Sequence, residues 1–235
     1  MEPTKKANQM SVQELAAYID QSVLKPEFTQ DDIRKYIQEG VDYGCATVCV
    51  NPASLDIAAA LTKGTQTGIC VVCDFPFGLS TTRSKVMQAE SYCKRGNITD
   101  LDIVANYGWI RSGMYKEVGK EIKEIVDVCH FHGTMVKVIF ETDALTTDEI
   151  KSAAEVIIQS GADFLKTSTG FYTGGKNDGA TKEIIATLME VAQGRCKIKG
   201  SGGIRTQQHF FDLIDMGIDR MGVGYRSTPV VLGIS

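Results

Sequence analysis

Short apolar runs alternate with longer amphipathic segments along nearly the whole chain, and this alternation constrains the fold more than any other feature. Eight apolar runs of strand length are predicted strands, at residues 18–24, 46–51, 68–74, 100–106, 135–141, 163–166, 197–199 and 220–224. Segments with helical spacing of apolar residues predict helices at 12–18, 31–43, 54–63, 84–95, 114–131, 147–160, 181–191 and 207–216. Strands separated by helices require crossover connections, so the pattern predicts a parallel sheet covered by helices.

Eight such units in 235 residues match a (β/α)8 TIM barrel with a short N-terminal helix, whose active site would lie at the C-terminal ends of the strands. We expect one domain spanning residues 1–235, because no linker or break in composition divides the chain. The alternative is a doubly wound open sheet. It is disfavoured because no Gly-x-Gly-x-x-Gly follows the first predicted strand.

Charge and cysteine usage exclude several classes of function. A net charge of -4 without a dense Lys/Arg run is not typical of a protein that binds nucleic acid or a membrane surface. No apolar stretch approaches the roughly 20 residues of a bilayer span, and no signal peptide is present, so we expect a cytoplasmic protein. The seven cysteines are expected to be mostly reduced and buried. Zinc at Cys45, Cys49, Cys70 and Cys73 is an alternative that the opposite facing of Cys70 and Cys73 on a strand disfavours.

Two lysines stand at the ends of predicted strands, directly before loops of small residues. Lys166 precedes Thr-Ser-Thr-Gly, and Lys199 precedes Gly-Ser-Gly-Gly. Two amines that converge at strand ends repel each other's charge, which lowers the pKa of one of them. A neutral amine is a nucleophile for carbonyl groups, so the pair predicts an enzyme that forms a Schiff base.

Other charged residues lie in or at the ends of the predicted strands. Asp102 lies inside an apolar strand, where a lone carboxylate is costly, and we expect it to be catalytic. Asp100, at the start of that strand, suits a loop cap. Lys137 and Glu141 share strand parity and are expected to join an internal ion-pair network. Lys197 is expected near the bottom of the barrel, reaching solvent.

Seven motifs in order resemble the deoxyribose-phosphate aldolase family, which consists of class I aldolases on a (β/α)8 barrel. The motifs are IDQSVLKP at 19–26, VCVNP at 48–52, FPFG at 75–78, LDIV at 101–104, KVIFET at 137–142, GADFLKTSTG at 161–170 and KGSGGIR at 199–205. The resemblance implies reversible cleavage of 2-deoxy-D-ribose 5-phosphate to D-glyceraldehyde 3-phosphate and acetaldehyde, in carbohydrate and deoxyribonucleotide catabolism. It implies no metal or other cofactor, and small-molecule sugar phosphate and aldehyde as partners.

The resemblance also implies residue roles. Lys166 would be the Schiff-base lysine, Lys199 the second lysine that favours the neutral form of the first and joins in proton transfer, and Asp102 the general acid/base, acting through water. Two glycine-containing loops, 167–170 and 200–205, would present backbone N–H groups and hydroxyls to a phosphate. The expected substrate-binding residues are Asp20, Thr167, Gly170, Gly202, Gly203 and Arg226.

The loop after the eighth predicted strand departs from the family pattern. Gly224-Tyr225 stands where the family has a phosphate-binding serine pair, so Tyr225 would fill space for a phosphate while Arg226 restores an anion contact. Lys176, in a long loop after Lys166, is another candidate phosphate partner. Two alternatives therefore stay open: a related class I aldolase with a different or non-phosphorylated acceptor, and a non-catalytic sugar-phosphate-binding barrel. A homodimer is compatible with such a barrel, although the sequence identifies no interface.

Overall fold

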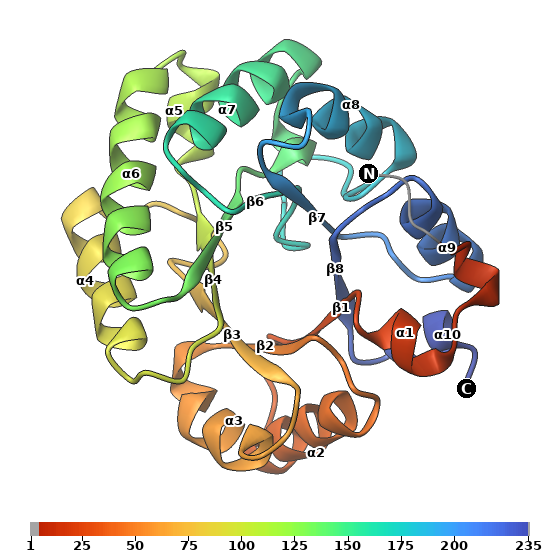
Figure 1. Ribbon diagram of the computed structural model, residues 1–235. Helices are drawn as coiled ribbons and strands as arrows, with labels where there is room; N and C mark the ends of the chain where they lie inside the picture. The colour runs from red at the N-terminus through yellow and green to blue at the C-terminus, as the bar shows by residue number, and fades with distance from the viewer. Residues whose placement is uncertain (1–4, 235) are drawn as a thin grey trace.

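All eight predicted strands form, and they pair in parallel in chain order until β8 returns to β1 and closes a barrel. The computed structural model describes residues 5–234. Figure 1 shows the strands around the centre and the helices outside them. The strands are β1 Ile19–Val23, β2 Thr47–Val50, β3 Gly68–Cys73, β4 Asp100–Val104, β5 Met135–Ile139, β6 Phe164–Lys166, β7 Lys197–Ser201 and β8 Arg220–Gly224. The predicted (β/α)8 barrel is therefore confirmed.

The predicted helices also form, with boundaries shifted by a few residues. They are α1 Val12–Ala16, α2 Gln30–Asp42, α3 Leu55–Thr62, α4 Thr82–Cys93, α6 Tyr115–Phe131, α7 Thr147–Gln159, α8 Lys182–Ala192 and α9 Gln207–Asp215. The sequence reading missed α5 Tyr107–Arg111, α10 Thr228–Leu232 and three 3-10 turns, Ala7–Gln9, Pro52–Ser54 and Thr142–Ala144. These elements are too short for a hydrophobic period to be seen. Within residues 5–234, no helix combines the length and the apolar character that crossing a membrane requires.

Side-chain caps fix where several helices begin. Ser11, Thr29 and Thr146 each accept a hydrogen bond from the backbone N–H three residues later. In each case the acidic residue at that third position bonds back to the backbone N–H of the cap, which completes a capping box. These caps satisfy N–H groups that a helix start would otherwise leave unpaired, so they stop the connecting loops at defined residues.

The fifth strand ends earlier than predicted. β5 stops at Ile139, and Glu141 adopts a left-handed backbone conformation with φ of 55°. A non-glycine residue rarely takes this conformation. The carboxylate of Glu141 accepts hydrogen bonds from the backbone N–H and the hydroxyl of Thr169. The turn therefore ties the end of β5 to the loop that follows β6.

Two different cores hold the barrel together. The outer faces of the strands pack against helices through buried aliphatic and aromatic side chains, among them Phe140, Leu165 and Phe210. The inside of the barrel instead holds buried charged side chains. Burial of charge is costly unless the groups are paired, so the contents of the barrel point to a site built at the centre.

Candidate active site

Asp102 on β4 lies between the two lysines that the sequence singled out. Its Oδ2 accepts hydrogen bonds from Lys166 Nζ at 2.6 Å and from Lys199 Nζ at 2.7 Å. The two lysines are register partners on the neighbouring strands β6 and β7, so their side chains enter the barrel at the same level. The structure thus brings together the three residues that were expected to be catalytic.

A second layer of charge lies beside this trio. Lys137 Nζ is hydrogen-bonded to Asp100 and lies 3.4 Å from both Asp20 Oδ2 and Asp102 Oδ1. The expectation that Lys137 joins an internal ion-pair network is confirmed, but the expectation that Glu141 joins it is wrong, because Glu141 bonds to Thr169 beyond the strand end. The expectation that Asp100 caps a loop is also wrong, since Asp100 is fully buried inside the barrel.

Asp20 joins the two layers rather than contacting the pocket. Its Oδ2 lies 2.5 Å from Lys199 Nζ, and its Oδ1 accepts a hydrogen bond from Arg220 Nη1 at 2.7 Å. Thr47 donates a further hydrogen bond to Oδ1. Asp20 is fully buried, lies against Lys199 and does not line the pocket described below, and its expected substrate contact stays a prediction.

The buried ions shift one another's protonation equilibria. Burial alone would raise the pKa of Asp102, but the cations of Lys166, Lys199 and Lys137 hold that pKa well below its usual value. Burial alone would lower the pKa of Lys199, but Asp102 and Asp20 raise it well above its usual value. Asp102 is therefore a carboxylate and Lys199 an ammonium at neutral pH.

The charge count of the barrel interior is uneven. Its cationic side chains are Lys137, Lys166, Lys199 and Arg220, and its carboxylates are Asp20, Asp100 and Asp102. Four cations thus face three carboxylates. One cation in the group lacks a counter-charge of its own, which favours the loss of one proton from the cluster.

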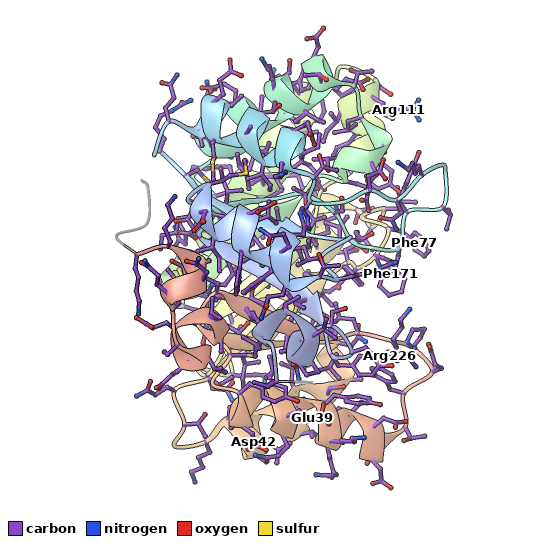
Figure 2. The ribbon with its side chains drawn as sticks, turned by 90° about the vertical axis from the view of Figure 1, so that its right-hand side faces the viewer. Glu39, Asp42, Phe77, Arg111, Phe171 and Arg226 are labelled. Carbon is purple, nitrogen blue, oxygen red and sulfur yellow. The ribbon has the colours of Figure 1, made fainter. Side chains whose placement is uncertain are left out.

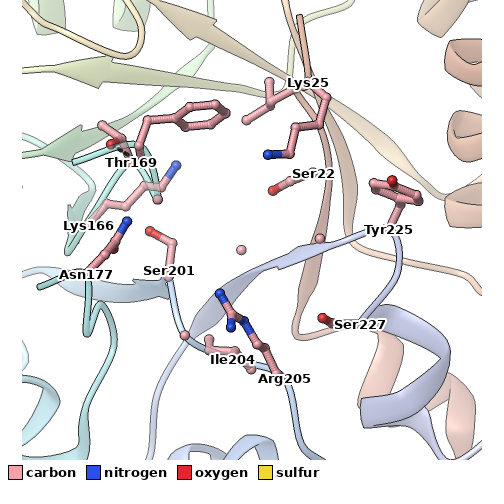
Figure 3. Close-up of a pocket in the computed structure, with 17 residues that line it drawn as sticks. Ser22, Lys25, Lys166, Thr169, Asn177, Ser201, Ile204, Arg205, Tyr225 and Ser227 are labelled. Carbon is pink, nitrogen blue, oxygen red and sulfur yellow. Dashed lines mark hydrogen bonds between the residues drawn. The ribbon is translucent and has the colours of Figure 1, made fainter. Parts of the chain in front are cut away.

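A pocket of about 270 Å³ opens above Lys166 at the C-terminal mouth of the barrel (Figure 3). It is lined by the loops that follow β1, β6, β7 and β8, and the predicted residues Gly170, Gly202 and Gly203 are part of its wall. Among the described residues that line it, the charged ones are Lys25, Lys166 and Arg205, and none is acidic. The pocket is therefore suited to an anionic ligand with a reactive group near Lys166.

The glycines of the β7 loop allow a close approach of backbone to backbone. Gly203 has a φ of 75°, and a Cβ at this position would lie 2.6 Å from the carbonyl oxygen of Asp178. A Cβ at Gly179 would meet the backbone of Gly202 at 2.4 Å. Only glycine fits these positions without displacement, so the loop after β6 packs directly on the loop after β7.

Thr167 has a different place from the one expected. It is fully buried, its hydroxyl donates to the carbonyl oxygen of Ser201 at 2.8 Å, and the same hydroxyl accepts from the Ser201 N–H at 2.9 Å. The side chain of Thr167 joins the ends of β6 and β7, and its expected substrate contact stays a prediction.

Arg226 and Lys176 also lie outside the pocket wall. The guanidinium of Arg226 lies over the ring of Tyr225, 5.3 Å from its centroid, and the Lys176 ammonium pairs with Asp178 at 2.8 Å. The expected anion contact of Arg226 stays a prediction. Figure 2 shows Arg226 at the same edge of the barrel as Phe77 and Phe171, beside the mouth. Lys197 is exposed, as expected, although strand parity would place it on the same face as the buried Lys199.

Sequence reasoning missed Lys25 and Arg205 as wall residues. Both follow the end of a predicted strand within a few residues, which was the signal that could have marked them. Figure 3 shows both side chains directed into the pocket from different loops. Ser22, Asn177 and Phe171 were missed as well, and all three line the pocket.

Among the residues that the structure describes, two groups of buried donor atoms have a spacing that suits a metal ion. One consists of Asp20, Cys70 and Asp100, whose carboxylates already contact the ammonium of Lys137. The sulfurs of Cys49 and Cys70 and a carboxylate oxygen of Asp102 lie within 4.8 Å of one another. However, Asp102 already contacts the ammonium groups of Lys166 and Lys199, which would repel a further cation. Neither donor set fits a resident metal.

A buried amine at a strand end, paired with a carboxylate and a second lysine at the mouth of a (β/α)8 barrel, defines an aldolase-type barrel. A family model described as DeoC/LacD family aldolase matches residues 15–227. The chain belongs to this family.

Named relatives and solved structures agree with this membership. The chain is 40% identical over 213 residues to a deoxyribose-phosphate aldolase of Desulfitobacterium hafniense, covering 91% of this chain and 95% of the relative. Its fold is similar to that of the aldolase QR15, with a TM-score of 0.84, 35% identity and coverage of 94% of this chain and 95% of that one. It is also similar to the tetrameric deoxyribose phosphate aldolase of Aeropyrum pernix, with a TM-score of 0.84, 28% identity and coverage of 95% and 91%.

Proposed function

We propose that this chain is a class I deoxyribose-phosphate aldolase that reversibly cleaves 2-deoxy-D-ribose 5-phosphate to D-glyceraldehyde 3-phosphate and acetaldehyde. The observation that carries the proposal is the position of Lys166, whose amine lines the pocket while it is hydrogen-bonded to Asp102. Lys199 and Lys137 contact the same carboxylate but do not line the pocket. Lys166 is therefore the amine of this cluster that a substrate carbonyl can reach.

In the proposed reaction, the neutral amine of Lys166 attacks C1 of the open-chain sugar. The resulting carbinolamine loses water and becomes a protonated imine. The bond between C2 and C3 then breaks as the C3 hydroxyl loses its proton, the electron pair passes into the imine, and D-glyceraldehyde 3-phosphate leaves. The remaining enamine takes a proton at C2, and hydrolysis of its imine releases acetaldehyde and the free lysine.

Asp102 and Lys199 are proposed to handle these protons. The low pKa of Asp102 keeps it a carboxylate that accepts hydrogen bonds from the reacting nitrogen, and the high pKa of Lys199 keeps an ammonium within 2.7 Å of the same oxygen. A carboxylate and an ammonium in contact can accept and return a proton through water. Asp20 holds Lys199 from the other side, at 2.5 Å.

The phosphate of the proposed substrate matches the electrostatics of the pocket. The wall contains Lys25 and Arg205 in addition to Lys166, and no described acidic residue. The Gly202-Gly203 turn adds backbone N–H groups of the kind that bind phosphate. Tyr225 lines the pocket and is stacked on Tyr36, with ring centroids 3.9 Å apart.

Reduction by borohydride in the presence of acetaldehyde tests the imine. We expect an irreversible gain of about 28 Da on the peptide that contains Lys166, the mass of an ethyl group that replaces a hydrogen. Lys166→Met should not gain it, whereas Lys197→Met, which changes an exposed lysine, should. Absence of labelling, or labelling only at other lysines, would contradict the aldolase proposal.

The choice of substrate is tested by comparing 2-deoxyribose with its 5-phosphate. A preference in kcat/KM of at least about a hundredfold, near 3 kcal/mol, supports the phosphorylated substrate. A smaller preference favours the related aldolase with a non-phosphorylated acceptor. If the chain shows neither activity nor imine trapping, the remaining alternative is a non-catalytic sugar-phosphate-binding barrel.

The cysteines and one related structure bear on the cellular location and the assembly of the chain. We propose a cytoplasmic enzyme, supported by the seven cysteines, all free and buried. We propose a homo-oligomer, with a dimer as the expected unit, since a related aldolase from Aeropyrum pernix is described as a tetramer. Light scattering of the purified chain measures this directly.

A further inference from the structure

Lys25 lies in the loop that follows β1 and reaches the pocket without a counter-charge from the protein. Its side chain lines the pocket, and within residues 5–234 its ammonium forms no ion pair. The same is true of Arg205 in the loop after β7. Figure 3 shows the two cationic groups directed into the pocket from different loops. Two cations without carboxylate partners repel each other, and an anion bound between them would offset this repulsion.

An aromatic cluster fixes the loop that carries Lys25. The backbone N–H of Phe28 donates to the carbonyl oxygen of Lys25 at 3.3 Å, which closes a turn. The ring of Phe28 packs edge-on against Tyr225, with centroids 5.1 Å apart, and lies 5.1 Å from Tyr36. Tyr225 therefore connects the end of β8 to the turn after β1.

Lys25 also spans the mouth of the pocket toward another loop. Its ammonium lies over the ring of Phe171, 5.2 Å from the centroid, and Phe171 packs edge-on against Phe75. The interaction between a cation and an aromatic face is weak, so the Lys25 ammonium can leave this contact. The ammonium is free to turn to an anion in the pocket while its turn stays in place.

We propose that Lys25 is a binding residue for the anionic group of the substrate, opposite Arg205, and that Tyr225 and Phe28 are positioning residues for it. This inference rests on the proposed function, whose substrate carries a phosphate. A charge-assisted hydrogen bond from Lys25 replaces the hydroxyl contacts to phosphate that the Gly224-Tyr225 segment cannot make. Glycine has no side chain, and the hydroxyl of tyrosine lies at the far end of a ring. Tyr225 then contributes to the phosphate site by holding the loop that carries Lys25.

The direct test is Lys25→Met, which keeps the length of the side chain and removes its charge. We expect kcat/KM for 2-deoxyribose 5-phosphate to fall by about ten- to a hundredfold, mostly through KM, because a hydrogen bond to a charged group is lost. The value for unphosphorylated 2-deoxyribose should change by less than about twofold. Lys25→Arg should restore most of the loss. Equal losses for both substrates, or no loss for either, would overturn the proposal.

Lys35→Met is the matched control. Lys35 lies on α2 with its ammonium 5.4 Å from the centroid of the Tyr36 ring, so it changes the same charge beside the same aromatic cluster, but it does not line the pocket. Its kinetics with both substrates should stay within about twofold of those of the unaltered chain, as for a surface substitution that touches no ligand. A loss equal to that of Lys25→Met would mean that general electrostatic attraction, and not contact, explains the effect.

The positioning role is tested at Tyr225. Tyr225→Phe keeps the ring and should leave KM unchanged, whereas Tyr225→Ala should raise KM for the phosphorylated substrate with a smaller effect on kcat. Equal behaviour of the two variants would remove Tyr225 from the proposal.

Inorganic phosphate gives a readout that does not need turnover. Calorimetric titration should show binding that Lys25→Met weakens at least about fivefold and Lys35→Met does not, as expected when one cation of an anion site is removed. Unchanged phosphate binding in Lys25→Met contradicts this inference alone. Failure of acetaldehyde trapping at Lys166 contradicts the aldolase function instead, so the two failures are distinguishable.

Discussion

Replacing Lys199 by methionine tests whether the second lysine sets the reactivity of the first. The side chain of Lys199 is fully buried, and methionine fills a similar volume without charge. In the unaltered chain the nitrogens of Lys166 and Lys199 lie 2.6 and 2.7 Å from the same oxygen of Asp102. They are therefore no more than about 5 Å apart, a separation at which two unit charges at an effective dielectric constant of about 20 repel by about 3 kcal/mol.

The size of the expected effect follows from this repulsion. About 3 kcal/mol corresponds to roughly two units of pH, because one unit is about 1.4 kcal/mol. Removing Lys199 also leaves the Asp102 carboxylate with one cation fewer, so it pairs more strongly with Lys166, which acts in the same direction. The pH at which trapping of acetaldehyde is half-maximal should therefore rise by about two units, and trapping at pH 7 should slow by about a hundredfold.

Stopped reaction with borohydride across a range of pH, read by mass spectrometry of the Lys166 peptide, measures this midpoint. Lys197→Met is the control, because Lys197 is two residues earlier on the same strand but is exposed and lies over the Phe164 ring. A thermal melt of each variant establishes that it is folded. An unaltered midpoint in folded Lys199→Met would refute the coupling between the two lysines.

Three further outcomes are expected. The free energy of unfolding, measured in urea, should be constant from pH 7 to about 5 and fall below about pH 4. Asp20 and Asp102 have depressed pKa values in the folded chain, so their contribution to stability is present above the unfolded pKa and is lost as pH falls. A flat profile to about pH 3 would contradict this. Gly203→Ala should raise KM for the phosphorylated substrate more than for 2-deoxyribose, because its Cβ would lie 2.6 Å from the Asp178 carbonyl. Lys85→Met should lower the free energy of unfolding by about 3–5 kcal/mol in chemical denaturation, because it leaves the buried carboxylate of Glu121, 2.6 Å from Lys85 Nζ, without its cation.

The fold was predictable because its signal is repeated along the chain. Each strand is an apolar run between helical segments, and an error at one strand end does not alter the topology. The errors occur where local backbone geometry overrides the pattern. The fifth strand was extended to residue 141, but Glu141 turns into a left-handed conformation and bonds to Thr169, a contact from a segment 28 residues away. Propensity along the chain contains no information on such a contact.

The site was predictable to the extent that strand parity determines it. Lys166, Lys199 and Asp102 were identified as polar residues on apolar strands, and a barrel brings such residues together. Which carboxylate pairs with which lysine depends on the stagger between strands. Lys137 stands opposite Asp102 in register yet forms its shortest contact with Asp100. Lys25 lies beyond a strand, and its direction follows from a turn and an aromatic contact that strand parity does not describe.

Lys166 and Lys199 occupy neighbouring register positions, so strand geometry alone does not decide which of them would bond to substrate in the proposed reaction. Lys199 lies between Asp20 and Asp102, with no exposed surface, and two carboxylates hold its proton. Lys166 shares one carboxylate with Lys199 and lines the pocket, with 4% of its surface exposed. The interior has one cation more than it has carboxylates, and of these two lysines Lys166 has the fewer carboxylate partners. Access to the pocket and the number of carboxylate partners therefore both favour Lys166 as the proposed Schiff-base lysine, while the buried acids keep Lys137 and Lys199 charged.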